Sequence, residues 1–555
     1  MMADCDSSPD HTPSRESDSA EVRAILWGRL GRSLEEGVTN ETPAISEQTA
    51  PTSGTARPPS IKRPTRLSDE WNELRRLRGS PDGQDNISIP SHRMESRRSI
   101  WKNFISLCTS LMCAFISFLP LRNIQSSLYT DYHLGTLSLA VIYGSFIIGC
   151  ILSSWIAQNA RPKGLILVSV FSHVLFVAAN MFPSFITLIP ASCLFGFLQA
   201  PLWSVQELLI GSYGTSYSAV TGMRMERSIQ QFQGVFVIFC HSAQIFGNLL
   251  ESLVLGMDDT TTNTMFHGNY SKYLREEART TNCTSPCQTP MKYSYHVFGY
   301  EIFPNTMLLD GRLHQVEILK IIFLAIGCVS VTLVGLCLRK PDIILNKRKM
   351  CLKEKVQESL SFFKTKTFLM LGLLMIFTGM QQGIVINDVT KVYGTNGLGL
   401  SMVGYFMMCY GTCQLATLLV LERFQKRVKP IIFVLQGFLI SLGLIILLYV
   451  WEPVDDCVYT VLGYMALWGA VDAVWQSQVQ NILVSNVTRK EPAIIGFRIC
   501  QGFGLTLVFL ASIWLSLLYK LCLVCGILIM GVLGYMILEI SNNPMTPMEP
   551  RPFNV

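Results

Sequence analysis

One carboxylate stands in the middle of a long apolar stretch of the chain. Residues 467–485 read LWGAVDAVWQSQVQNILVS, and Asp472 is their only acid. Helical spacing places Trp468, Asp472 and Trp475 on one face, with Gln476 beside the acid. A charged group at membrane depth is costly, so such a residue usually faces a bundle interior or a water-filled cavity. The stretch therefore predicts other membrane helices packed around Asp472.

A second polar stripe occurs in an earlier apolar stretch. Gln199, Trp203 and Gln206 recur there at helical spacing, and Gln199 lies at a depth similar to that of Asp472. If the two stripes faced each other, they would line a central cavity able to hold a cation or an amphipathic solute. Alternatively, the acid and the amides hydrogen-bond between helices and only fix their packing. The residues favour neither interpretation. The candidate cavity residues are Gln199, Trp203, Gln206, Trp468, Asp472 and Trp475.

The composition requires a membrane to surround these stripes. The chain has 555 residues, of which 49% are hydrophobic and only 15% charged, and its mean hydropathy is +0.34. Apolar runs long enough to cross a bilayer recur along it, which predicts an all-α membrane protein with about twelve spans. We place the spans at residues 104–121, 135–157, 164–182, 184–206, 232–255, 315–337, 367–387, 400–421, 431–450, 457–484, 493–517 and 519–539.

The distribution of basic residues predicts the orientation. Lys and Arg concentrate in alternate loops, and the positive-inside rule then puts both termini in the cytosol. The net charge of +6 does not indicate nucleic-acid binding, because these residues lie between spans and not on one soluble face. The start of the chain is polar and acidic, so we expect no cleavable signal peptide.

Two polar regions carry candidate modification sites. Residues 1–100 have the composition of a disordered cytosolic tail, in which Ser80 and Ser99 follow Arg-rich stretches suited to basophilic kinases. The long outer loop 256–314 contains glycosylation sequons at Asn269 and Asn282. Cys283 and Cys287 in the same loop form either a disulfide or two free thiols.

Short motifs recur in the same order in the two halves of the chain. The paired positions are Gly135 with Gly399, Lys163 with Lys429, Trp203 with Trp475, and Gln233 with Gln501. All four pairs are separated by nearly the same number of residues, which predicts two six-helix halves in the parallel repeat of a major-facilitator architecture. The halves would be residues 101–337 and 367–539, joined by a basic cytosolic linker, 338–366, and followed by a cytosolic tail, 540–555.

Four segments carry a family likeness. They are IQSSLY (124–129), APLWSVQ (200–206), GNLLESLVLG (247–256) and WGAVDAVWQSQ (468–478). The chain from residue 102 to about residue 540 resembles the uncoordinated-ninety-three family of major-facilitator-like proteins. The founding member, in nematode muscle, is a regulatory subunit of a two-pore-domain potassium channel, and a vertebrate branch escorts toll-like receptors to endolysosomes. The resemblance thus implies potassium-channel subunits, or else other membrane receptors, as partners, and it favours the plasma membrane over endosomes.

Three functions follow from these observations. The first is a non-transporting channel regulator; loop 157–164 fits it, because it lacks the Gly/Asp/Arg-rich signature of transporting major facilitators. The second is a secondary transporter that uses Asp472, and the third is a receptor trafficking chaperone. We expect no enzyme activity, cofactor or metal, because no nucleophile–base pair, metal cluster or phosphate-binding loop lies in a soluble region.

Several residues near or within the spans have two interpretations. Glu207 and Glu251 lie near predicted span ends, which favours the membrane interface. Arg498 could pair with a carboxylate or extend to the headgroups. The small residues Gly144, Gly149, Gly404 and Gly411 could admit a partner helix, but packing within the chain's own bundle is the favoured interpretation.

Overall fold

The computed structural model describes residues 96–257, 295–297, 300–302, 313–339, 351–424, 427–451 and 458–542. All of them belong to the larger of the two compact units into which the chain divides. Ser80, Asn269, Asn282, Cys283 and Cys287 lie outside the described residues, as does nearly all of region 1–100.

Twelve helices in the described part are long and apolar enough to cross a membrane. Those of the first half are α3 (Arg97–Leu128), α4 (Leu134–Asn159), α5 (Pro162–Ala179), α6 (Phe185–Thr221), α7 (Met225–Leu255) and α10 (Leu313–Leu336). Those of the second half are α12 (Lys366–Ile384), α13 (Leu400–Phe424), α14 (Pro430–Val450), α15 (Val458–Ser485), α16 (Lys490–Trp514) and α17 (Leu517–Asn542). The prediction of about twelve spans is confirmed.

The remaining elements are short. A 3-10 turn, η1 (Asp131–His133), precedes α4, and the helix α11 (Leu352–Leu360) with the turn η2 (Ser361–Lys364) precedes α12. A π-helical segment, η3 (Val385–Leu398), prolongs α12. Two strands, β1 (Tyr295–Val297) and β2 (Tyr300–Ile302), pair antiparallel and add a small sheet to the helical prediction.

Local sequence explains where several helices begin and end. Pro162 and Pro430 stand in the first turns of α5 and α14, where a missing N–H costs nothing. Ser184 caps α6 through a reciprocal hydrogen-bond pair with Thr187. This helix continues beyond its predicted end at residue 206, and it stops only at Gly222, whose φ of +72° suits glycine.

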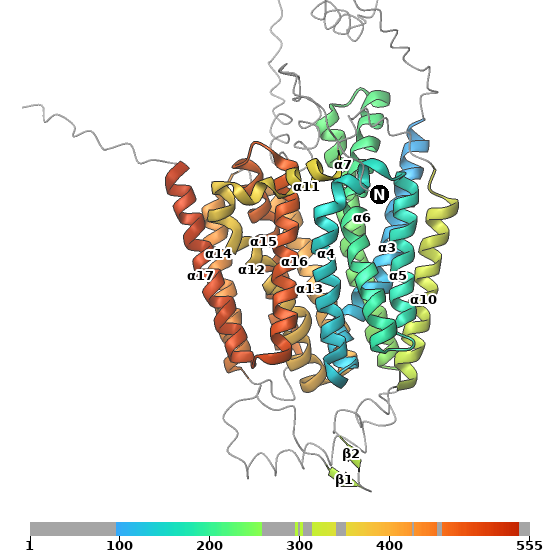
Figure 1. Ribbon diagram of the computed structural model, residues 1–555, viewed down its shortest axis with the longest axis vertical. Coiled ribbons are helices and arrows are strands. Elements are labelled where there is room, and N and C mark those ends of the chain that lie inside the picture. Colours follow the sequence, from blue (N-terminus) through green and yellow to red (C-terminus); the bar gives the residue numbers. More distant parts are fainter. Residues whose placement is uncertain are drawn as a thin grey trace, which may run out of the picture. The chain divides into compact units, whose positions relative to one another are not determined.

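The helices pack as two halves. In the first half, α6 contacts α4 and α5, and α3 contacts α7 and α10; in the second, α12 contacts α16 and α17, and α13 contacts α15. The closest contacts between the halves are α4 with α16 and α7 with α13, and α3 also contacts α13 and η3. Figure 1 shows the blue to yellow-green helices of the first half on one side and the gold to red helices of the second on the other, with α16 beside α4. The predicted two-half architecture is therefore confirmed.

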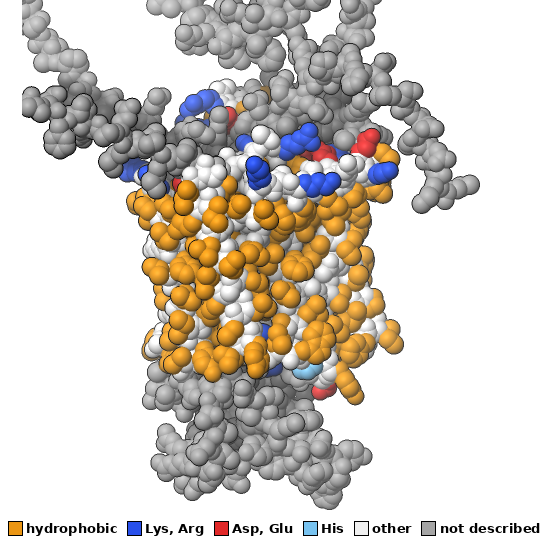
Figure 2. Space-filling view, turned by 60° about the vertical axis from the view of Figure 1, so that its left-hand side comes forward, with side chains coloured by type: hydrophobic (Ala, Val, Ile, Leu, Met, Phe, Trp, Pro, Cys, Tyr) orange, Lys and Arg blue, Asp and Glu red, His pale blue; other side chains and the backbone are white. Residues whose placement is uncertain are grey.

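The surface of the helices suits a bilayer. Figure 2 shows a broad band of hydrophobic side chains, with Lys and Arg gathered at one rim. Large apolar side chains within the band are exposed, among them Leu439 and Ile446 of α14 and Met530 and Ile537 of α17. Twelve apolar helices that carry such a band indicate a multi-pass membrane protein.

Candidate functional site

Asp472 lies fully buried on α15, and its carboxylate accepts hydrogen bonds from four side chains. Oδ2 accepts from the Tyr410 hydroxyl at 2.8 Å and from Gln414 Nε2 at 2.6 Å, both on α13. Gln382 Nε2 of α12 lies 3.1 Å from Oδ2 and 3.3 Å from Oδ1. The fourth donor is Gln476 Nε2, one turn along α15, which lies 3.5 Å from Oδ1. We call these five residues the Asp472 network.

The Asp472 network extends to two further helices. Gln501 of α16 donates to Gln382 Oε1 at 3.2 Å. His241 of α7 hydrogen-bonds Gln414, so one contact reaches into the first half. The network therefore connects helices from both halves through neutral donors around a single acid.

This geometry limits what Asp472 can bind. An ionised carboxylate offers about four lone-pair positions, and four protein donors already use them. A cation would have to displace at least one of these donors. The arrangement also satisfies the buried charge without a counter-ion, because each donor stabilises the acceptor-only form. It therefore suits a carboxylate that holds α12, α13 and α15 together.

Trp468 and Trp475 are fully buried within the second half. The indole Nε1 of Trp475 donates to Ser441 Oγ of α14 at 2.8 Å, and its ring meets Phe377 of α12 edge-on at 5.5 Å. Gly437 of α14 makes room for this ring, since a Cβ there would lie 3.2 Å from Trp475 Cζ2. These contacts point Trp475 towards α14 and α12 and not towards the first half.

The residues of the first-half stripe, Gln199, Trp203 and Gln206, do not share one set of neighbours. Gln199 contacts His173 of α5, with 3.3 Å between the two Nε2 atoms. Gln206 is buried at 1% exposure. Trp203 is half-buried and stacks on Phe115 of α3, with ring centroids 5.6 Å apart. Gln199 and Asp472 thus have separate partners, and within this stripe it is Trp203 that contacts the second half.

That contact is made by Arg498 of α16. Its guanidinium lies 5.4 Å above the Trp203 ring and forms an ion pair with Glu207 of α6, Nη2 to Oε1, at 2.5 Å. Of the two interpretations left open for Arg498, the structure shows the pairing with a carboxylate. Glu251, expected at the membrane interface, lies near the end of α7 with its side chain fully buried among the helices.

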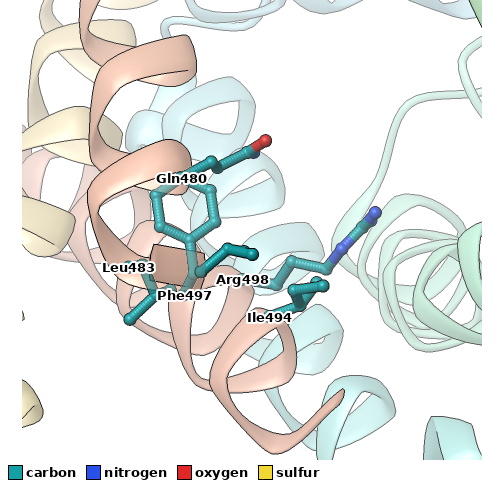
Figure 3. Close-up of a pocket in the computed structure, with 6 residues that line it drawn as sticks. Gln480, Leu483, Ile494, Phe497 and Arg498 are labelled. Atoms are coloured by element: carbon teal, nitrogen blue, oxygen red, sulfur yellow. The ribbon is translucent and has the colours of Figure 1, made fainter. Parts of the chain in front are cut away.

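A small pocket adjoins Arg498 between α15 and α16. It holds about 270 Å³ of empty space, part of which is open to solvent. Figure 3 shows its walls and the Arg498 side chain extending away from Phe497 and Leu483. The lining residues are Gln480, Leu483, Val484, Ile494, Phe497 and Arg498. In the described part of the chain, no group of three or more His, Cys, Asp or Glu side chains could hold a metal.

Hydrogen bonds join the two halves at both ends of their interface. At one end, Thr395 Oγ1 donates to Ser127 Oγ at 2.8 Å, and Ser252 Oγ donates to the Ser401 carbonyl at 2.7 Å. At the other end, the Glu207–Arg498 pair is accompanied by Ser154, which donates to Glu491 Oε1 at 3.0 Å. Helix α11 lies at this second end and packs against both α4 and α16.

Glycines permit the close packing of helices within the bundle. A Cβ at Gly149 would collide with the Phe197 carbonyl of α6, and one at Gly404 with the Asn248 carbonyl of α7. At Gly411 it would lie 2.7 Å from Gln244 Cγ. The favoured interpretation, packing within the chain's own bundle, is confirmed for Gly149, Gly404 and Gly411, whereas a Cβ at Gly144 would meet only Thr506 Cγ2, at 3.9 Å.

Sequence reasoning missed three of the four donors to Asp472. Gln382, Tyr410 and Gln414 are neutral and lie in two helices far from Asp472 in the sequence. A signal was present, because Tyr410 and Gln414 are one turn apart and an amide in an apolar span needs a partner.

The family model for "Ion channel regulatory protein UNC-93" matches residues 129–536. Human "Protein unc-93 homolog A" is 27% identical over 464 residues, which cover 82% of this chain and 96% of the relative. The "Putative potassium channel regulatory protein unc-93" of Caenorhabditis elegans is 23% identical over 460 residues, covering 80% of this chain and 61% of that protein.

Solved structures show the same fold. The nucleoside transporter NupG aligns with a TM-score of 0.53 at 12% identity, covering 80% of this chain and 99% of that one. A D-xylose-proton symporter aligns with a TM-score of 0.51 at 12% identity, covering 80% and 96%. At this level of sequence identity, the likeness shows a shared fold and does not indicate a substrate or a function. With most of its length matched by the family model, the chain belongs to the UNC-93 family, described as ion channel regulatory proteins.

Proposed function

We propose that this chain is a regulatory subunit of a potassium channel, of the two-pore-domain type, and that it transports no solute itself. The observation that carries the proposal is the state of the Asp472 carboxylate, which accepts hydrogen bonds from four donors of the same chain. A coupling carboxylate in a transporter must exchange its partners, whereas this one is saturated. The family description and the name of the nematode relative supply the class of partner.

The regulator would meet the channel within the bilayer. Helices α14 and α17 present exposed glycines, Gly443 and Gly526, at which nothing of the chain lies within 4 Å of an added Cβ. Small residues of this kind let a second helix approach closely. Phosphorylation of Ser80 or Ser99 would add charge on the cytosolic side and alter the contact. Ser99 lies in the first turn of α3, where Arg339 Nη1 donates to its hydroxyl at 3.5 Å.

The orientation and domain limits belong to the same proposal. Both termini face the cytosol of a plasma-membrane protein, supported by the rim of Lys and Arg in Figure 2. The halves then comprise residues 101–337 and 367–539, with loop 256–314 outside the cell. This side would allow glycosylation of Asn269 and Asn282 and oxidation of Cys283 and Cys287.

The test is to isolate the tagged full chain in mild detergent from native tissue and identify stoichiometric partners by mass spectrometry. We expect a potassium-channel subunit in near-equal amount, and coexpression of that subunit with the chain should change its current, surface density or gating. Recovery of toll-like receptors in its place would support a trafficking chaperone. A chain recovered alone, with unchanged currents for every coexpressed two-pore channel, would refute the proposal.

A secondary transporter is the second candidate. It is favoured by the half-buried amides Gln382, Gln414 and Gln476, which place polar groups around a fully buried acid. Uptake of a solute into proteoliposomes under a pH gradient, lost in Asp472→Asn, would establish this function. Uptake that is unchanged in Asp472→Asn would remove the residue from any coupling mechanism.

A further inference from the structure

Glu251 is a buried acid without a partner. It lies on α7 at 0% exposure, and neither of its carboxyl oxygens has a hydrogen-bond partner within the part of the chain that the structure describes. No ion pair is formed by it there. An isolated carboxylate at such a position would be far too costly in its charged form, since the low dielectric removes its hydration and nothing replaces it.

Several other acids in the described part of the chain have a basic or hydrogen-bonding partner, which sets Glu251 apart. These pairings are Asp472 with its four donors, Asp388 with Lys520, Glu207 with Arg498, Glu317 with Lys320, and Glu358 with Lys355. The chain therefore supplies counter-charges or donors where it keeps an ionised acid, and it supplies none to Glu251.

The packing around Glu251 is tight and crosses the interface between the halves. Three residues before it, Asn248 accepts a 2.8 Å hydrogen bond from Asn123 of α3. The next residue, Ser252, donates to the Ser401 carbonyl of α13. Gly404 of α13 lies so close that a Cβ would meet Asn248 and Ser252. A charge that appeared at Glu251 would be next to the hydrogen bonds that hold α7 against α13.

We propose that Glu251 is a proton-binding site whose occupancy holds α7 and α13, and with them the two halves, in the arrangement of this structure. The protonated acid is neutral and tolerates burial, so the halves stay in contact. Loss of the proton leaves a carboxylate that water must reach, which favours separation of α7 from α13 near Ser252 and Ser401. The site is independent of the identity of any channel partner.

A proton fits the site better than a metal cation. Hard cations need several oxygen ligands around them, whereas the nearest polar side chains in sequence, Asn248 and Ser252, are committed to Asn123 and Ser401. Several charged or titratable groups on α7 and on the helices that contact it are engaged elsewhere. They are Arg122 of α3 with Tyr143, Glu207 of α6 with Arg498, Glu317 and Lys320 of α10 with each other, and His241 of α7 itself with Gln414. On α13, Glu422 and Arg423 lie in the last turn, at the opposite end from Ser401.

Infrared difference spectroscopy of the full chain in lipid vesicles tests the protonation state directly. The spectrum of Glu251→Gln is subtracted from that of the unsubstituted protein at neutral pH. We expect the difference to contain the carbonyl stretching band of a protonated carboxyl group in an apolar surrounding. Asp472→Asn is the control and should keep this band, because Glu251 is unchanged in that variant. A difference with ionised-carboxylate bands would overturn the proposal.

The pH dependence of stability is the second measurement. If Glu251 holds a proton in the folded protein and releases it on unfolding, the free energy of unfolding falls as the pH rises above the range where exposed glutamates titrate. The unfolding temperature should therefore fall with pH more steeply in the unsubstituted protein than in Glu251→Gln. Glu207→Gln is the matched control and should keep the steeper dependence. Equal slopes in all three proteins would refute the site. Should Glu251→Gln not fold, Glu251→Asp keeps an acid there and should shift the carboxyl band instead of removing it.

Discussion

Arg498 of α16 forms an ion pair with Glu207 of α6 while its guanidinium lies over the ring of Trp203. The two helices belong to different halves, so the pair joins the halves near the rim that carries α11. Each charged side chain keeps 21% exposure. Water therefore screens the pair in part, and it is neither a surface contact nor a fully buried one.

Breaking this pair should lower stability by a measurable, moderate amount. We expect a coupling free energy of about 1 kcal/mol between Glu207→Gln and Arg498→Gln, because a partly exposed pair lies between the surface and buried limits. Thermal unfolding of both single variants and the double variant gives the coupling. Additive effects would show that the two side chains do not interact in the membrane.

Replacing Asp472 by Asn should destabilise the second half. The variant keeps the shape but loses the charge that four donors share, and it presents an N–H₂ group to them, so we expect a loss of about 3 kcal/mol. Tyr410→Phe removes one donor and should cost about 1.5 kcal/mol. Unfolding measured by tryptophan fluorescence reports both. An Asp472→Asn protein as stable as the original would show that the network does not hold the helices.

Two glycines on α15 should respond in opposite directions to the same substitution. A Cβ at Gly469 would collide with the Tyr410 carbonyl, so Gly469→Ala must separate α13 from α15 and should cost about 1–3 kcal/mol. Gly463 has nothing within 4 Å, and Gly463→Ala should stabilise the helix by up to about 1 kcal/mol. The unfolding temperatures of the two single variants, each compared with that of the unsubstituted protein, test this prediction. Similar effects at the two positions would contradict the close contact.

Glycosylation checks the proposed orientation. Asn269→Gln and Asn282→Gln should each increase the gel mobility of the expressed chain, and the double variant should no longer respond to endoglycosidase. Asn486 heads a third sequon next to the end of α15, on the side assigned to the cytosol. Asn486→Gln should therefore leave the mobility unchanged. A shift caused by Asn486→Gln alone would reverse the orientation.

The helices were predictable from sequence because apolar runs of bilayer length leave the backbone one way to satisfy its hydrogen bonds. The pairing of halves also followed, from motifs such as those at Trp203 and Trp475. The side-chain contacts of the candidate site could not be predicted from the sequence as well as the helices could. Which way Trp475 points depends on the space left by Gly437 and on the acceptor Ser441. Both lie on another helix, and helix rotation is set by such neighbours.

The two buried acids Asp472 and Glu251 also show that the sequence does not reveal which helices surround a side chain. Asp472 could be located by its surroundings in the sequence, but its donors come from helices α12 and α13. Glu251 was assigned to the interface because it lies near the end of a span, yet α7 is covered there by α3 and α13. Depth along a helix is readable from sequence, whereas cover by other helices is not.

The hydrogen bonds between the halves have a consequence for the affinity of any partner. A partner that recognises one arrangement of the helices binds with an apparent dissociation constant divided by the fraction of molecules already in that arrangement. Contacts at both ends of the interface, such as Thr395 with Ser127 and Arg498 with Glu207, favour the present arrangement, so they raise that fraction for a partner that recognises it. Binding then requires little prior reorganisation. Conditions that weaken either set of contacts would lower the affinity without changing a single residue at the binding surface.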